Sequence, residues 1–201
     1  MADLLEAMET IPGRMALVDP SIRPLSPGLK MAGQAVTVHT FPGDGLAVHR
    51  ALQLAGPGQV LVITSVGETR SPLFAELLSL AARAKGLAGV VVDGPVRDAD
   101  ALMESRFPVW CRGTYAGRPM KRGPGEINVP VVCGGVVVEP GDIIVADGDG
   151  VLRVGLAAAA GCSLEPRPAR TKRWIFVRQS PPASRWATVW VSRSASGERF
   201  T

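Results

Sequence analysis

The chain has 201 residues, and nearly half of them are apolar, which is enough to build the core of one domain and excludes an intrinsically disordered chain. No apolar run approaches the roughly 20 residues that a membrane-spanning helix needs. The net charge is +4, but residues 1–154 carry 14 basic and 16 acidic side chains, whereas residues 155–201 carry 8 basic and 2 acidic ones, so the basic character does not indicate that the folded body binds nucleic acid.

The N-terminal part of the chain alternates predicted helices with predicted strands. Residues 2–8 are predicted to form a short amphipathic helix, and this acidic start differs from the basic start of a signal peptide, so we expect a cytoplasmic protein. After a proline-rich segment, the pattern predicts a strand over 35–39, then a helix that Asp44 caps and that runs through Leu54. A further strand is predicted over 60–64.

Residues 73–102 have the clearest pattern in the chain. Apolar residues recur there at helical spacing and predict a helix, which the β-branched run 90–92 follows. Because that run is apolar throughout, we expect a strand covered on both faces. Residues 93–95, Asp-Gly-Pro, are expected to end the strand. The apolar residues at helical spacing are Leu77, Leu80, Ala81 and Ala84.

Arg97 and Asp98 stand at the start of the next predicted helix, residues 99–104. Loops just past the carboxyl ends of strands are where α/β proteins usually place their chemistry. A cation beside a carboxylate there can hold an anionic substrate and a divalent metal side by side. A plainer interpretation is that Asp98 caps the helix and that Arg97 is a solvated surface arginine. The local pattern alone leaves both interpretations open.

Beyond residue 107 the pattern changes to short strands. A long ordered loop is expected over 114–128, and the Asp-Gly-Asp-Gly cluster at 147–150 is interpreted as a hairpin turn because it lacks the spacing and the closing Glu of a calcium-binding EF-hand. Helix–strand alternation followed by strands alone predicts a layered α/β architecture. The predicted strands are 108–112, 129–132, 136–138, 143–146 and 151–154.

Two further features carry less information. Cys111, Cys133 and Cys162 are widely spaced without a CxxC pair, which argues against a disulfide framework and a zinc site and favours small buried hydrophobes. The basic segment 155–201 contains three of the four Trp residues. It admits three interpretations: RNA binding by charge and stacking, an arm that packs on a partner subunit, or an unstructured or out-of-frame extension.

Three stretches of the body resemble the RraA-like (regulator of RNase E activity A-like) family. Its enzymatic members are 4-hydroxy-4-methyl-2-oxoglutarate and 4-carboxy-4-hydroxy-2-oxoadipate aldolases. The stretches are PGDGLAVHRAL at 42–52, AELLSLAARAKGLAGVVVDGPVRDAD at 75–100 and KRGPGEINVPVVCGGVVVEPGDIIVADGDGV at 121–151, and residues 17–38 fit as well. The resemblance implies an RraA-like domain over 1–154, folded as a layered β/β/α sandwich resembling the phosphohistidine swivelling domain, followed by an atypical tail over 155–201.

The resemblance also implies a set of site residues. The family's acidic-x20-Arg-Asp motif maps onto Glu76, Arg97 and Asp98. By this resemblance Asp98 would bind Mg²⁺ or Mn²⁺, Arg97 would contact the keto oxygen of the substrate, and Glu76 would orient metal-bound waters. The backbone amides of Leu77 and Leu78 would take the substrate carboxylate. Family members assemble as trimers or hexamers with sites between subunits, so we expect a homotrimer or hexamer.

Elementary chemistry agrees with these roles. Cleavage of the bond next to a 2-keto acid leaves a pyruvate enolate, which a divalent metal stabilises as a Lewis acid and to which Arg97 adds a fixed positive charge. A helix N-terminus near Leu77 offers N–H groups to an anion. A metal-bound water can take the substrate hydroxyl proton, so neither His39 nor His49 is needed as a base. The predicted function is a metal-dependent aldolase or decarboxylase that acts on 4-hydroxy-2-oxo acids or oxaloacetate and releases pyruvate.

Two other functions stay open. One is a non-catalytic regulator that binds and inhibits a ribonuclease, but the regulator proper lacks the Asp after the Arg, and this chain has Asp98. The other is the demethylmenaquinone methyltransferase that family nomenclature suggests, for which no Gly-rich cofactor loop is suitably placed. The chain departs from the family at Ala75, where Gly is frequent, and at Ala101, where an acidic residue is frequent. The Glu that the aldolases borrow from a neighbouring subunit cannot be mapped onto the tail.

Overall fold

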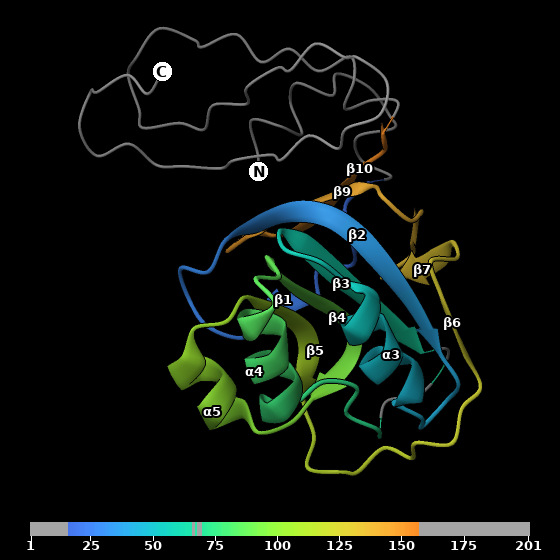
Figure 1. Ribbon diagram of the computed structural model, residues 1–201. Helices are drawn as coiled ribbons and strands as arrows, with labels where there is room; N and C mark the ends of the chain where they lie inside the picture. Colours follow the sequence, from blue (N-terminus) through green and yellow to red (C-terminus); the bar gives the residue numbers. More distant parts are fainter. Residues whose placement is uncertain (1–15, 66, 68–69, 157–201) are drawn as a thin grey trace, which may run out of the picture.

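The computed structural model describes residues 16–65, 67 and 70–156 (Figure 1). The predicted helix at 2–8, Cys162 and the tail beyond residue 156 lie outside these residues. The helices of the described part are α3 (Leu46–Leu54), α4 (Glu76–Ala84) and α5 (Ala99–Ser105). The strands are β1 (Arg23–Pro24), β2 (Met31–Thr40), β3 (Gln59–Ser65), β4 (Gly89–Val96), β5 (Val109–Thr114), β6 (Gly125–Ile127), β7 (Val131–Cys133), β8 (Val136–Val138), β9 (Ile143–Asp147) and β10 (Gly150–Val154).

A parallel sheet forms the centre of the fold. Strands β2, β3, β4 and β5 are hydrogen-bonded side by side and parallel, in an eight-stranded sheet whose order is β1-β5-β4-β3-β2-β9-β10, with β6 paired to β2. Parallel neighbours need crossover connections, and α3, α4 and α5 supply them in turn. The carboxyl ends of the four parallel strands therefore meet at one edge of the sheet.

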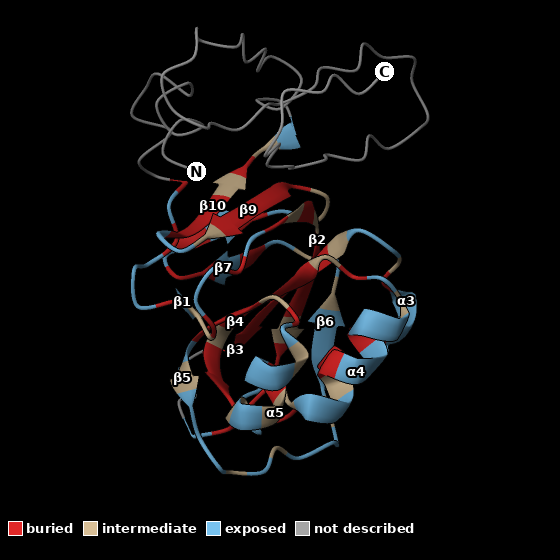
Figure 2. Ribbon diagram, turned by 90° about the vertical axis from the view of Figure 1, so that its left-hand side faces the viewer, coloured by how far each residue is buried: buried red, intermediate tan, exposed pale blue. Residues whose placement is uncertain are grey.

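The two faces of this sheet bury different layers. Val90 and Val92 of β4 belong to a core shared with the three helices, whereas Val91 between them belongs to a core shared with β7, β8, β9 and β10. This alternation is what a pleated strand covered on both faces requires. Figure 2 shows the consequence, with buried central strands and outward helix faces that are exposed. The layered β/β/α arrangement expected from the sequence is confirmed.

Two local expectations are wrong. Strand β4 does not end at Asp93 but continues to Val96, with a register shift against β5 between Val92 and Pro95. Such an irregularity tolerates proline inside a sheet, because the proline need not donate to the ladder. The expected loop over 114–128 contains the short strand β6, which pairs antiparallel with β2.

The apolar positions that predicted α4 lie on its outward face. They do form a helix, but Leu77 is 77% exposed, whereas Ser79 and Ala82 are buried and Leu78 packs against the core. The residues 147–150, in contrast, make the predicted hairpin turn between β9 and β10. No helix in the described part of the chain is long and apolar enough to cross a membrane.

Candidate functional site

Asp98 has an unusual backbone conformation at the end of β4. Its φ of 60° and ψ of 44° place it in the left-handed region, which costs a non-glycine residue about 1–3 kcal/mol, although Asp tolerates it better than most. Asp98 occupies the N-cap position of α5, yet its side chain makes no cap hydrogen bond. Its Oδ2 instead accepts the backbone N–H of Glu76 at 3.4 Å. The interpretation of Asp98 as a helix cap is therefore wrong.

Arg97 is half-buried and held from several sides. Its backbone N–H donates to the carbonyl of Phe74 at 3.1 Å, and its Nη1 donates to the carbonyl of Gly117 at 3.5 Å. Its Nε lies 3.6 Å from Oδ2 of Asp98, and this buried nitrogen has no hydrogen-bond partner among the described residues. The interpretation of Arg97 as a solvated surface arginine is also wrong. The guanidinium has one donor directed to a neutral carbonyl and a carboxylate beside it.

The amino end of α4 completes a cluster with Arg97 and Asp98. The Ser79 N–H donates to the carbonyl of Ala75 at 3.0 Å, so the N–H groups of Leu77 and Leu78, which precede it, have no acceptor within the helix. These N–H groups carry the positive end of the helix dipole. Leu77 is exposed and Leu78 is half-buried. An anion at this helix end would meet hydrogen-bond donors and positive potential.

The register of the sheet explains why Glu76 and Asp98, which are 22 positions apart, meet here. Phe74 forms a parallel bridge with Val96, so the segment that leads into α4 runs alongside the last residue of β4. The chain then places Glu76 beside Asp98. The structure thus brings together Arg97, Asp98 and the backbone of Glu76. The role of the Glu76 carboxylate, which lies at the surface, stays a prediction.

The substitution of Ala75 for the family's frequent glycine causes no backbone strain. Ala75 has a φ of −156°, which is extended backbone that any residue adopts. A methyl group is therefore compatible with the entry to α4.

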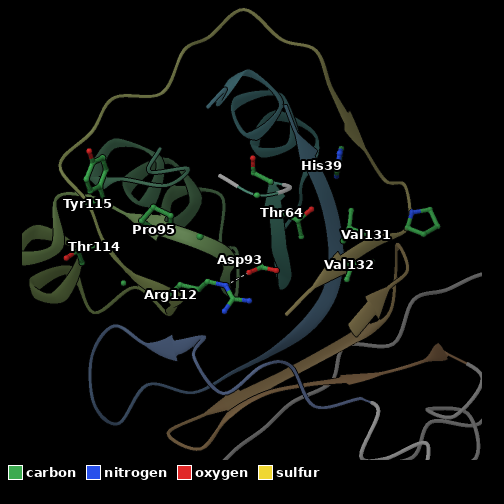
Figure 3. Close-up of a pocket in the computed structure, with 14 residues that line it drawn as sticks. His39, Thr64, Asp93, Pro95, Arg112, Thr114, Tyr115, Val131 and Val132 are labelled. Atoms are coloured by element: carbon green, nitrogen blue, oxygen red, sulfur yellow. Dashed lines mark hydrogen bonds and ion pairs between the residues drawn. The ribbon is translucent and has the colours of Figure 1, made fainter. Parts of the chain in front are cut away.

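A pocket opens at the same edge of the sheet, as Figure 3 shows. It encloses about 790 Å³ and is lined by the carboxyl ends of all four parallel strands. Arg97 and Asp98 do not line it, but Pro95 and Tyr115 do, and the Tyr115 N–H donates to the carbonyl of Val96. The pocket is thus a neighbour of the cluster along β4. The lining residues are His39, Thr64, Ser65, Gly67, Asp93, Gly94, Pro95, Arg112, Gly113, Thr114, Tyr115, Pro130, Val131 and Val132.

An ion pair that was not predicted from the sequence lines this pocket. Asp93 Oδ1 accepts Nε of Arg112 at 2.5 Å, and Asp93 Oδ2 accepts the Gly134 N–H at 2.7 Å (Figure 3). Burial lowers the pKa of Arg112, but the hydrogen bond and charge of Asp93 outweigh burial and raise that pKa above its ordinary value. The only signal in the sequence was position, because both residues stand near the ends of predicted strands.

Neither histidine is close to the cluster by any described contact. His39 lines the pocket at the end of β2, and His49 lies half-buried on α3. Burial, and then the charge of Lys121, lowers the pKa of His49 below its ordinary value.

The donor set fits a hard divalent cation held mainly by water and substrate. Among residues 16–65, 67 and 70–156, no group of three or more His, Cys, Asp or Glu side chains is arranged to hold a metal. Zinc sites need three or four protein ligands, which this cluster does not offer. Mg²⁺ keeps several waters and is commonly bound by one or two carboxylates plus substrate, and Asp98 suits that role because its side chain is partly exposed.

A comparison with protein families decides the membership of this chain. The family model for RraA-like proteins, described as Aldolase/RraA, matches residues 1–153. The chain belongs to the RraA-like family. A relative from Halalkalibacterium halodurans, named "Putative 4-hydroxy-4-methyl-2-oxoglutarate aldolase", is 44% identical over 65% of this chain, a match that spans 62% of the relative's own length. A relative of the same name from Burkholderia multivorans is 38% identical over 75% of this chain and 92% of that protein.

A solved RraA structure shares the fold. The RNA-processing inhibitor RraA from Thermus thermophilis is 33% identical, with a TM-score of 0.64 over 69% of this chain and 84% of that chain. The RraA-like fold expected from the resemblance is thereby confirmed. The relatives carry several kinds of name, among them aldolase, RNA-processing inhibitor and 2-dimethylmenaquinone methyltransferase, so the activity is a separate question from the fold.

Proposed function

We propose that this RraA-like protein is a divalent-metal-dependent carbon–carbon lyase that releases pyruvate from 4-hydroxy-2-oxo acids or from oxaloacetate. One observation carries the proposal: Arg97 and Asp98 lie together against the amino end of α4, with Nε and Oδ2 3.6 Å apart. This site combines a guanidinium, a partly exposed carboxylate and free helix N–H groups. Such groups can bind a 2-keto acid and stabilise its enolate. The names of the aldolase relatives support the same activity.

Each residue has a distinct role in this proposal. The N–H groups of Leu77 and Leu78 would bind the substrate carboxylate, and Arg97 would face the keto oxygen. Asp98 would hold Mg²⁺ or Mn²⁺, which when bound supplies Lewis-acid stabilisation of negative charge on the keto oxygen. Glu76 would orient water at the exposed side of Asp98.

The positive charge of Arg97 matters because of where electrons move. As the C3–C4 bond of a 4-hydroxy-2-oxo acid breaks, the 4-hydroxyl gives its proton to a water molecule and C4 becomes the carbonyl carbon of one product. The bonding electrons pass into the 2-keto group and form the enolate of pyruvate, which is protonated at C3 to give pyruvate. Decarboxylation of oxaloacetate forms the same enolate, with CO₂ as the other product. Arg97 is fixed in place before the charge develops, so its stabilisation requires no rearrangement.

The decisive experiment measures pyruvate release from oxaloacetate with lactate dehydrogenase as the coupling enzyme. Reactions contain Mg²⁺, Mn²⁺ or a chelator, and the enzyme-free metal-catalysed rate is subtracted. We expect turnover that needs both the metal and Arg97, with loss in Arg97→Ala. Turnover that survives the chelator, or that Arg97→Ala leaves intact, would contradict the site. The same assay with 4-hydroxy-4-methyl-2-oxoglutarate tests the aldolase activity.

The alternative function is that of a regulator that binds and inhibits a ribonuclease. The observation that favours it is the likeness to the Thermus RNA-processing inhibitor. Asp98 and its contact with Glu76 favour the lyase instead. A ribonuclease inhibition assay together with the pyruvate assay separates the two functions. We also propose a homotrimer or hexamer, which sedimentation or mass photometry measures directly.

A further inference from the structure

Asp44 is a buried carboxylate that joins two segments distant in the sequence. Its side chain is 2% exposed. Oδ1 accepts the N–H of Leu46, at the start of α3, at 2.8 Å. Oδ2 accepts the N–H groups of Arg122 and Gly123 at 2.6 Å and 3.0 Å. Only the first of these contacts, that of a helix cap, was predicted from the sequence.

The contacts of Asp44 Oδ2 anchor the 115–124 loop, which connects β5 to β6. Besides the bonds to Asp44, the Met120 N–H donates to the carbonyl of Gly43, and the Gly45 N–H donates to the carbonyl of Met120, both at 2.8 Å. Five hydrogen bonds therefore fasten the distal half of the loop to the turn at 41–45. Two run from loop N–H groups to the Asp44 carboxylate, and three join backbone groups, including the Phe41 N–H to the carbonyl of Pro124 at 3.3 Å. None of them depends on a loop side chain.

The proximal half of the same loop touches Arg97. The carbonyl of Gly117 is the acceptor of Arg97 Nη1 at 3.5 Å. Gly117 sits in a confined place, because a Cβ there would lie 2.5 Å from the ring of Tyr115 and 2.8 Å from the carbonyl of Arg70. The Gly117 carbonyl is neutral, so it orients the guanidinium without adding negative charge to that of Asp98, whose Oδ2 lies 3.6 Å from Nε of Arg97.

We propose that Asp44 is a positioning residue for Arg97. By anchoring the 115–124 loop, its carboxylate keeps the Gly117 carbonyl against the guanidinium and so holds Arg97 in one orientation. Both carboxylate oxygens are needed, because each accepts N–H groups from a different segment. An asparagine would direct an NH₂ group at backbone donors, whichever way its side chain turned. The consequence for turnover rests on the proposed function, but the consequence for Arg97 does not.

The test compares Asp44→Asn with a matched control, Asp142→Asn. Asp142 is also 2% exposed, and its Oδ2 accepts the N–H of Glu139 and Nε of Arg153. Its carbonyl accepts the N–H of Ala35 in the middle of β2, whereas Asp44 follows the carboxyl end of that strand. The control therefore reproduces the loss of a buried carboxylate away from the 115–124 loop.

The first readout is independent of activity. Phenylglyoxal modifies arginine side chains, and mass spectrometry gives the modification rate of Arg97 itself. We expect a several-fold faster rate at Arg97 in Asp44→Asn and no change in Asp142→Asn. Gly117→Ala, which displaces the carbonyl without touching Asp44, should produce the same increase and serves if Asp44→Asn fails to fold. Arg97 modification at the wild-type rate in a folded Asp44→Asn or Gly117→Ala protein would overturn the proposal.

The second readout is a double-mutant cycle on pyruvate release. We expect Asp44→Asn to lower kcat/KM by about tenfold to a hundredfold, as misplacement of a substrate-binding group does, and to have little further effect when Arg97 is already alanine. If the loss of kcat/KM in the double variant is the product of the losses in the two single variants, the positioning role is overturned. If the wild-type protein shows no turnover but phenylglyoxal modifies Arg97 faster in Asp44→Asn, the lyase proposal fails and the positioning of Arg97 stands.

Discussion

The backbone N–H of Glu76 donates to Oδ2 of Asp98 across 22 positions of sequence, at 3.4 Å. The carboxylate at the end of β4 thus serves the first turn of α4 and leaves its own helix, α5, without a side-chain cap. A residue kept in a left-handed conformation for a contact outside its own helix is under a constraint other than local folding.

Asp98 is expected to be required for activity and dispensable for folding. Asp98→Asn keeps an oxygen for the Glu76 N–H and tolerates the left-handed backbone, but it loses the charge that would hold a metal. We expect metal-dependent pyruvate release to vanish while the thermal midpoint changes little. Asp98→Ala should abolish activity as well and lose about 1 kcal/mol more stability, because alanine is less tolerant of positive φ. Full activity in either variant would exclude Asp98 as the metal ligand.

The N–H of Leu77 can be removed without removing the helix. Proline is tolerated in the first turn, where the N–H has no helical acceptor, so Leu77→Pro should stay folded. If that N–H binds the substrate carboxylate, KM for oxaloacetate should rise by about tenfold, the value of one charge-assisted hydrogen bond. Leu77→Ala measures the contribution of the side chain alone. Equal KM values for the two variants would count against a substrate contact at this N–H.

The stability that Asp44 contributes should decrease at acidic pH. Burial raises the pKa of Asp44, but the N–H bonds from Leu46, Arg122 and Gly123 outweigh burial and hold the pKa below its ordinary value. A carboxylate with a lowered pKa in the folded state stabilises fully above the unfolded value of about 3.9 and less as the pH falls through the folded value. The difference in unfolding free energy between wild type and Asp44→Asn should therefore be constant from pH 7 to about pH 5 and shrink below about pH 4. Urea titrations at each pH measure it. A difference that did not shrink in acid would mean that the Asp44 charge does not stabilise the fold.

Cys111 and Cys133 are expected to be chemically inert in the folded protein. Both lie in the core, and burial raises the pKa of each thiol above its ordinary value, with Asp93 contributing at Cys133. Because the thiolate is the reactive form, iodoacetamide should not modify either residue at pH 8 until a denaturant is added. Peptide mass spectrometry reports each cysteine separately. Modification of Cys133 under native conditions would show that this part of the core opens readily.

Several features were predictable because they depend on neighbours in the chain. The run of valines at 90–92 predicted a doubly covered strand, and the structure divides those residues between two cores. Asp44 was recognised as a helix-start residue, and its Oδ1 does bind the N–H of Leu46. The motif of Glu76, Arg97 and Asp98 came from family resemblance. Helical and strand periodicities are local, so a single sequence contains them.

Other features exist only in the folded molecule. That Asp98 binds the Glu76 N–H and does not cap α5 depended on the parallel bridge between Phe74 and Val96, which sheet register creates. The second partner of Asp44 lies 78 positions away, and no periodicity links the two. The inward face of α4 also differed from its apolar pattern, since Ser79 and not Leu77 meets the core. Local propensity specified the elements, whereas the register and packing of the sheet decided which side chains meet, because those contacts join segments that the chain holds far apart.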